Sequence, residues 1–294
     1  TFFSFWLGSS DVLGYAIGAA SNPQILTTNE AFAQRFSLAL GAMLQANPDA
    51  KGAVANIPNL NVLPYFNLVP WNALPLNAPT AGVVNQGYAA YNGGLFQLQS
   101  MGAITEAERI LRTINFAAGQ NGFLMTDESL TDLSQFGLPS IRQSKSTDKP
   151  TLTLSQALGQ PVGGNSQVVR GVSFPVEDLY VLTPTEQKEI QDKINAFNGV
   201  ISAAVQSNAE RLVLVDINGL LNRVLQGQVN FSGATLTASI IPPNGGFSVD
   251  GVHPNGRAHG FIANEFINAI NAKWESNIPL LNPNAIPGND LPVQ

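Results

Sequence analysis

Three short, largely apolar segments separated by helical patterns constrain the fold of this chain most strongly. They lie at 1–7, 51–56 and 211–216, and the last has a continuous apolar centre. Such strands are typical of a parallel sheet that helices cover on both faces. The strand–helix–strand order at the start predicts a right-handed parallel crossover. We therefore expect an α/β fold, a three-layer α/β/α sandwich with a parallel sheet.

The helices of this sandwich are expected at 29–46, at 217–226, and after Thr183 and Pro254. Apolar residues spaced four apart form one stripe on the first of these helices. Thr183-Pro184-Thr185-Glu186 has the pattern of a capping box, with threonine as N-cap, proline in the first helical position and glutamate in the third. This pattern predicts a helix that begins at Pro184.

The segment 60–180 differs in composition from the segments on either side of it, which indicates an insertion. Prolines interrupt its first part repeatedly, a helical stretch follows at 83–117, and 126–175 is rich in Ser, Thr and Gly. We predict an α/β core formed by 1–59 and 181–294, with 60–180 as an inserted, mainly helical and irregular cap.

Composition excludes several classes of function. The chain has 294 residues, a net charge of -6, and only 12% charged residues. Nucleic acid is not an expected partner, because its phosphates require clustered Lys and Arg. The absence of Cys excludes disulfides, thiolate-bound zinc and a cysteine nucleophile. With two His and no acidic cluster at metal spacing we expect no metal site, and without a strand–GxGxxG–helix pattern no dinucleotide cofactor.

The candidate catalytic pair is Asp250 and His253, in Asp250-Gly251-Val252-His253-Pro254 directly before an amphipathic helix. An Asp three residues before a His, across a tight turn, is able to accept a hydrogen bond from one ring nitrogen. The other nitrogen is then left as a general base. A loop histidine that is merely held by a nearby carboxylate is the alternative interpretation.

The residues around this pair carry a family resemblance. The run from Asp250 through Gly256-Arg257-Ala258-His259-Gly260 into the helix closely resembles the last block of the GDSL/SGNH hydrolases. In that family the Asp and His of this block complete a Ser-His-Asp triad. The resemblance implies that Asp250 orients the ring and His253 moves the serine proton, on an SGNH/flavodoxin-like fold without a cofactor. His259 has no role in the family, and we expect it to be a core or helix-surface residue.

The opening segment is similar to the third block of the same family, strand-Gly-x-Asn-Asp. The matching residues here are Gly8, Ser10 and Asp11, in Phe5-Trp6-Leu7-Gly8-Ser9-Ser10-Asp11. The family's Asn donates to the oxyanion of the tetrahedral intermediate, and Ser10 takes its place. Loss of one such donor typically costs about 100- to 1000-fold in rate. The similarity continues through Asn56-Ile57-Pro58, the helix at Thr183 and Asn277-Ile278-Pro279-Leu280, and the chain resembles a Bacteroidetes-type extracytoplasmic subgroup of the family.

The resemblance leaves the position of the nucleophile open. If Gly8 to Asp11 is the third block, the family's Gly-Asp-Ser block lies upstream of Thr1, or on a companion chain, or is lost. Alternatively Gly8-Ser9-Ser10-Asp11-Val12-Leu13-Gly14-Tyr15 is a degenerate first block with Ser10 as nucleophile. On the plainest interpretation, Ser9 and Ser10 are turn residues at the end of a strand.

Two functions follow as expectations. The first is the C-terminal part of an ester hydrolase that acts on an ester-bearing small molecule, a lipid or an acylated glycan, with its nucleophile in an N-terminal segment or companion chain. The second is a catalytically impaired binding or assembly module of the cell envelope. The low charge and the resemblance together predict an extracytoplasmic bacterial protein, in the periplasm or associated with the outer membrane, with lipoprotein attachment as one route.

Overall fold

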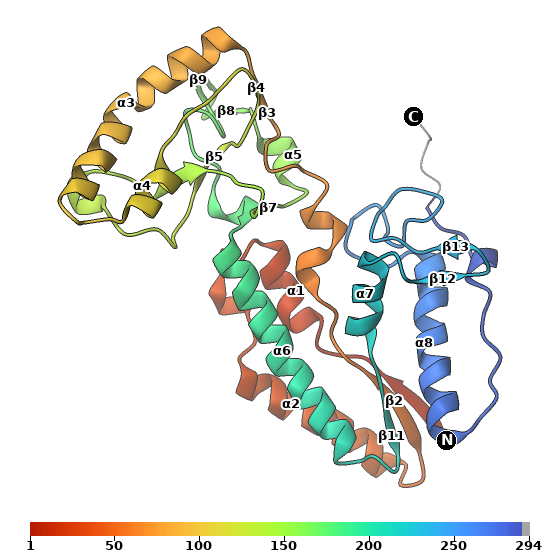
Figure 1. Ribbon diagram of the computed structural model, residues 1–294. Helices are drawn as coiled ribbons and strands as arrows, with labels where there is room; N and C mark the ends of the chain where they lie inside the picture. The colour runs from red at the N-terminus through yellow and green to blue at the C-terminus, as the bar shows by residue number, and fades with distance from the viewer. Residues whose placement is uncertain (290–294) are drawn as a thin grey trace. The chain divides into compact units, whose positions relative to one another are not determined.

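The computed structural model describes residues 1–289, which divide into two compact units (Figure 1). The first unit contains Thr1–Ile17, Asn22–Tyr65 and the chain from Lys188 onward. The second unit contains Gly18–Ser21 and Phe66–Gln187. The main boundaries thus fall after residues 65 and 187, where the sequence-based prediction placed them after 59 and 180.

The first unit is a mixed α/β structure built on a small parallel sheet. The sheet order is β1-β2-β11, and both pairings are parallel, with Phe5 opposite Val54 and Leu214 opposite the same residue. The parallel pairing of β1 with β2 confirms the crossover connection expected from the sequence. The elements of the unit are β1 (Phe2–Phe5), α1 (Ser10–Ile17), η1 (Pro23–Ile25), α2 (Asn29–Ala46), β2 (Lys51–Ala55), η2 (Leu60–Val62), most of α6 (Pro184–Gln206), β11 (Leu212–Val215), α7 (Ile217–Leu225), β12 (Asn230–Phe231), β13 (Ala234–Thr235), α8 (Gly256–Trp274) and η6 (Pro283–Ala285).

Aromatic side chains pack the helices of the first unit onto its sheet. Phe5 meets Phe36 of α2 edge-on at 5.3 Å between ring centroids. Phe32 of α2 stacks on Phe197 of α6 at 3.9 Å, which joins these two helices. Trp6, one residue after Phe5, instead contacts α8, where its ring lies 6.4 Å from that of Phe266. Because successive side chains of a strand point to opposite faces, β1 is covered by α2 on one side and α8 on the other.

The second unit combines the helices α3, α4 and α5 with short antiparallel strand pairs. The single helical stretch predicted at 83–117 is wrong in detail, because Gly102 adopts a positive φ of +76° and the chain forms two helices. Pro79 begins the longer helix rather than breaking it, as proline is tolerated in the first turn. The short helix η3 (Pro64–Phe66) contains the boundary after Tyr65. The elements of the second unit are β3 (Leu74–Leu76), α3 (Ala78–Ser100), α4 (Glu106–Arg112), β4 (Gly119–Asn121), β5 (Leu124–Thr126), η4 (Ser134–Phe136), β6 (Ile141–Gln143), β7 (Lys149–Pro150), α5 (Leu154–Ala157), β8 (Pro161–Val162), β9 (Asn165–Val169), η5 (Asp178–Tyr180) and β10 (Val181–Leu182).

A buried ion-pair network lies within this second unit. The Arg142 guanidinium is 2.5 Å from Asp127 and pairs with both oxygens of Asp148 at 2.6 and 2.7 Å. All three side chains are almost fully buried. Such a network is stable only because every charge has a partner, so loss of either carboxylate is expected to be strongly destabilising.

The capping box at the start of α6 is confirmed. The Glu186 carboxylate accepts hydrogen bonds from the backbone N–H and the hydroxyl of Thr183, at 2.7 and 2.8 Å, and Thr183 Oγ1 accepts from Glu186 N. Among residues 1–289, no helix has both the length and the apolar character that a membrane span requires.

Candidate functional site

Three side chains tie together the carboxyl ends of the strands β1, β2 and β11. The Trp6 indole N–H donates to the carbonyl of Asn56 at 3.2 Å. The Asn56 amide donates to Asp216 at 2.8 Å and accepts from the backbone N–H of Asn218 at 2.8 Å. Asp216 is also the N-cap of α7, where it accepts from Gly219 N. The first residues beyond each strand are therefore held in fixed positions relative to one another.

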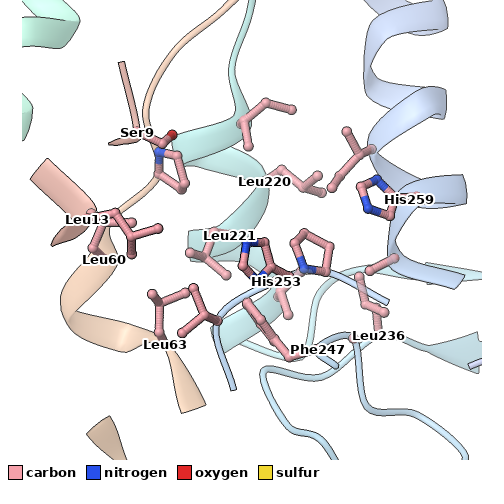
Figure 2. A pocket seen from close by; sticks show the side chains of 18 of the residues that line it. Ser9, Leu13, Leu60, Leu63, Leu220, Leu221, Leu236, Phe247, His253 and His259 are labelled. Carbon is pink, nitrogen blue, oxygen red and sulfur yellow. The ribbon is translucent and has the colours of Figure 1, made fainter. Parts of the chain in front are cut away.

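A cavity of about 360 Å³ opens at this edge of the sheet (Figure 2). In open α/β sheets, ligands bind in the crevice outside the carboxyl ends of the strands. The segments after β1, β2 and β11 all contribute to the walls, together with the 236–254 loop and α8. The lining residues are Trp6, Ser9, Ser10, Leu13, Pro58, Leu60, Leu63, Ile217, Leu220, Leu221, Val224, Leu236, Thr237, Gly246, Phe247, Val252, His253, Pro254, Ala258, His259 and Ile262.

Asp250 and His253 form the pair that the sequence predicted. His253 Nδ1 lies 2.7 Å from Asp250 Oδ2, which holds this nitrogen as the donor. The other carboxylate oxygen accepts from the backbone N–H groups of Val252 and His253 at 2.9 and 3.0 Å. The His253 side chain is 72% exposed and lines the cavity. Within the described part of the chain its Nε2 has no hydrogen-bond partner, so this nitrogen is open to a ligand.

The Asp250 carboxylate stays ionised well into acid. Partial burial opposes ionisation, but hydrogen bonds from Ser248, from the His253 ring and from two backbone N–H groups outweigh it and hold the pKa of Asp250 well below its ordinary value. Ser248 Oγ donates to Asp250 Oδ1 at 2.5 Å, and Ser248 N donates to the carbonyl of His253 at 2.7 Å. Ser248 was not among the predicted site residues, although a serine two residues before an aspartate in a turn is a recognisable signal.

Gly251 sets the shape of the turn between the two candidate catalytic residues. Its φ of +71° lies in the left-handed region that favours glycine. Its carbonyl accepts from Tyr65 N at 3.0 Å, and a Cβ added here would lie 2.7 Å from that nitrogen. The turn is thus anchored against the 64–65 backbone in a way that only a glycine permits.

The predicted third-block residues divide into two groups. Ser10 is the exposed first residue of α1 and lines the cavity with Ser9, so the structure brings both serines and His253 to one cavity. Gly8 and Asp11 do not line it. Gly8 has φ +113° and packs against Ile57 and Phe32, and Asp11 accepts a hydrogen bond from Thr27 Oγ1 at 2.8 Å. Their positions fit a role in shaping the strand-to-helix turn.

His259 was expected to be a core or helix-surface residue; it is an exposed residue in the first turn of α8, and it also lines the cavity. Both histidines of the chain therefore face the same space (Figure 2). The sequence contained a usable signal, since His259 is only four residues beyond the N-cap Asn255, and Ala258 and Ile262 on the same helix line the cavity too.

Comparison of the chain with models of protein families, with curated proteins and with solved structures gave no match.

The second unit contains a separate group of acidic side chains. Carboxylate oxygens of Glu128, Asp178 and Glu186 lie within 4.8 Å of one another. Burial, followed by the negative charges of Glu128 and Glu186, raises the pKa of Asp178 to about 7. Burial also raises the pKa of Glu186 to about 7, against the hydrogen bonds from Thr183. Spacing along the chain gave no sign of this group, because its members come from three separate segments.

The geometry at the cavity supports proton transfer more directly than metal binding. The only polar side chains on its lining are those of Ser9, Ser10, Thr237, His253 and His259, among the residues that the structure describes. A carboxylate-held imidazole with a free Nε2 is suited to take a proton from a hydroxyl and return it to a leaving group.

Proposed function

We propose that this chain is the C-terminal part of a GDSL/SGNH-type serine ester hydrolase in which His253 is the general base and acid and Asp250 its orienting partner. The observation that carries the proposal is the 2.7 Å contact between His253 Nδ1 and Asp250, with the ring placed on the wall of a cavity at the carboxyl edge of a parallel sheet. The family resemblance of the Asp250–Pro254 block supplies the reaction class.

The first unit is proposed to be part of a three-layer α/β/α sandwich. Support comes from β1, whose Phe5 packs on Phe36 of α2 while Phe2 and Trp6 pack on Trp274 and Phe266 of α8. The order β1-β2-β11 also leaves the outer edge of β1 unpaired within the described residues. We propose that the nucleophile-bearing segment, upstream in the same protein or on a companion chain, adds to the sheet at this edge.

The proposed reaction begins when His253 Nε2 removes the proton of the nucleophilic serine. The serine oxygen attacks the ester carbonyl, and the protonated ring then gives its proton to the departing alcohol. Asp250 stabilises the imidazolium while it exists. Ser10 is proposed as an oxyanion donor, because its hydroxyl lies on the cavity where the family has an Asn. Water finally hydrolyses the acyl-serine by the reverse set of proton transfers.

The decisive experiment is ester hydrolysis and fluorophosphonate labelling by the protein purified from its own cells. His253→Ala is expected to lower kcat/KM about 100- to 10,000-fold, the usual contribution of a positioned acid–base group. Val249→Ala is the matched control, since Val249 is exposed in the same loop and does not line the cavity. Unchanged turnover in His253→Ala would refute the assignment.

The second candidate is a binding or assembly module that has kept the fold and lost catalysis. The observation in its favour is that, within residues 1–289, no serine hydroxyl is hydrogen-bonded to His253 Nε2. It predicts that fluorophosphonate labels no serine of the protein or of a companion chain, while ligands still bind in the cavity.

A further inference from the structure

The walls of the cavity consist mainly of aliphatic side chains. Leucines contribute from four segments, α1, η2 with the residue after it, α7 and the 236–247 loop, and Val224 and Ile262 add to them. None of the lining residues among those described is Asp, Glu, Lys or Arg. The five polar side chains of the lining can pair only part of the hydroxyl groups of a sugar, and a charged group would find no carboxylate, ammonium or guanidinium partner, so both would lose binding free energy here.

The size of the cavity limits what it can hold. Its volume of about 360 Å³ lies near the lower end of the range for ligand sites. A methylene group occupies about the volume of a water molecule in its liquid, about 30 Å³, so the space corresponds to about twelve such groups. One aliphatic chain fits, and two chains of lipid length do not.

The position of His253 relates this space to the proposed chemistry. Figure 2 shows Leu13, Leu60 and Leu63 on one side of the His253 ring, with Leu236 and His259 on the other. An ester carbonyl beside His253 therefore has aliphatic wall within reach.

We propose that the cavity is an acyl site for one unbranched aliphatic chain of about twelve carbons, which makes esters of medium-length fatty acids the substrates. This inference rests on the proposed function in one respect: only the proposed hydrolase activity makes the bound molecule an ester. The binding of the aliphatic chain itself does not depend on catalysis, and it is tested separately.

The binding test uses linear 2-alkanones of about four to fourteen carbons, which have a carbonyl and cannot be hydrolysed. Their affinity is measured by displacement of an anilinonaphthalene sulfonate probe and by saturation-transfer NMR. Affinity is expected to rise about fourfold per methylene as the chain fills the cavity, and to level off at or before about twelve carbons. Phenyl ketones of equal carbon number are expected to bind more weakly.

Leu221→Phe and Leu225→Phe form the matched pair of variants. Both residues lie on α7, but Leu221 is buried and lines the cavity, whereas Leu225 is 44% exposed and does not. Leu221→Phe shortens the space by about two methylenes, so the longest ketones that fit are expected to lose about 15-fold in affinity. Leu225→Phe is expected to match the parent, and circular dichroism reports whether both variants are folded.

The outcomes separate the acyl site from the proposed function. Affinity independent of chain length, equal binding of phenyl ketones, or equal effects of the two variants would overturn the acyl site. If the binding results are as expected and the purified protein hydrolyses no ester, the acyl site stands and the hydrolase assignment fails. Ester turnover with no preference for chain length would overturn the acyl site, while the hydrolase assignment would stand.

Discussion

Replacement of Gly251 by alanine tests whether the turn that presents His253 depends on close backbone contact. Gly251 is buried, has φ +71°, and its carbonyl accepts from Tyr65 N at 3.0 Å. A Cβ would lie 2.7 Å from Tyr65 N and 3.0 Å from Tyr65 Cα. Because both atoms belong to the backbone, the two segments must separate to make room.

The expected cost has two parts. An alanine in the left-handed region costs about 1–2 kcal/mol, offset in part because the unfolded chain loses about 0.4–1 kcal/mol of conformational freedom. Separation of the segments weakens the hydrogen bond from Tyr65 N to the Gly251 carbonyl, which costs about 1–3 kcal/mol if those groups lose their partner. We therefore expect Gly251→Ala to lower the free energy of unfolding by about 2–4 kcal/mol.

Gly227→Ala measures the cost of a positive φ alone, without the close backbone contact that an alanine at 251 would make with Tyr65. Gly227 has nearly the same φ of +67°, lies in the same unit, and has no atom within 4 Å of an added Cβ. Gly227→Ala should lower the free energy of unfolding by only about 1 kcal/mol. Urea unfolding followed by tryptophan fluorescence measures both variants. If Gly251→Ala costs no more than Gly227→Ala, the anchoring of the 250–253 turn on Tyr65 contributes nothing and the reasoning fails.

Two further predictions concern carboxylates. Asp250→Asn places an amide against His253 Nδ1 and favours the tautomer with its proton on Nε2, so kcat of ester hydrolysis should fall about 10,000-fold; a fall below tenfold would exclude this role. Burial raises the pKa of Asp178 from 3.8 to about 7. Between these values the folded protein binds a proton that the unfolded chain has released, so the free energy of unfolding falls as pH rises. Asp178→Asn should therefore stabilise the protein more at about pH 8 than at about pH 5 in urea melts, and equal effects at the two pH values would contradict it.

Local patterns in the sequence were sufficient for the three sheet strands of the first unit and for its helices α2, α6, α7 and α8, but not for α1 or its shorter elements. The helix predicted at 29–46 is α2, and the strand at 211–216 is β11 to within a residue at each end. The capping box at Thr183 predicted the start of α6 because both of its partners lie within four residues. In each case the deciding interactions are local in the chain or follow from a simple apolar period.

The second unit was harder to predict because its structure depends on contacts between distant residues. Its strands have two to five residues, too few to show a period, and their pairing partners cannot be read from the sequence. The buried Arg142 pairs with Asp127, which lies 15 residues away. Such a side chain looks like an ordinary surface arginine until the fold is known.

The candidate site also combines a part that local sequence predicts and a part that depends on contacts between distant residues. Asp250 and His253 are three residues apart, so their contact was predictable from the turn. The cavity is assembled from segments that span residues 6 to 262, and no local pattern marks Leu60, Leu221 or Phe247 as neighbours. The sequence thus predicted the contact between Asp250 and His253 and missed the cavity that His253 lines.

The fixed orientation of His253 also restricts where a nucleophile can come from. Because Asp250 holds Nδ1, only Nε2 remains to accept a proton, and a serine hydroxyl must come within about 2.6–3.2 Å of it. Ser9 and Ser10 are on the same cavity, yet in the described chain neither hydroxyl is hydrogen-bonded to that nitrogen. Catalytic hydrogen bonds often form only when substrate is bound, so the attacking role and the oxyanion role both stay open for Ser10. A nucleophile from another segment would need a place beside the end of β1, and the outer edge of that strand is where the described sheet has room for one.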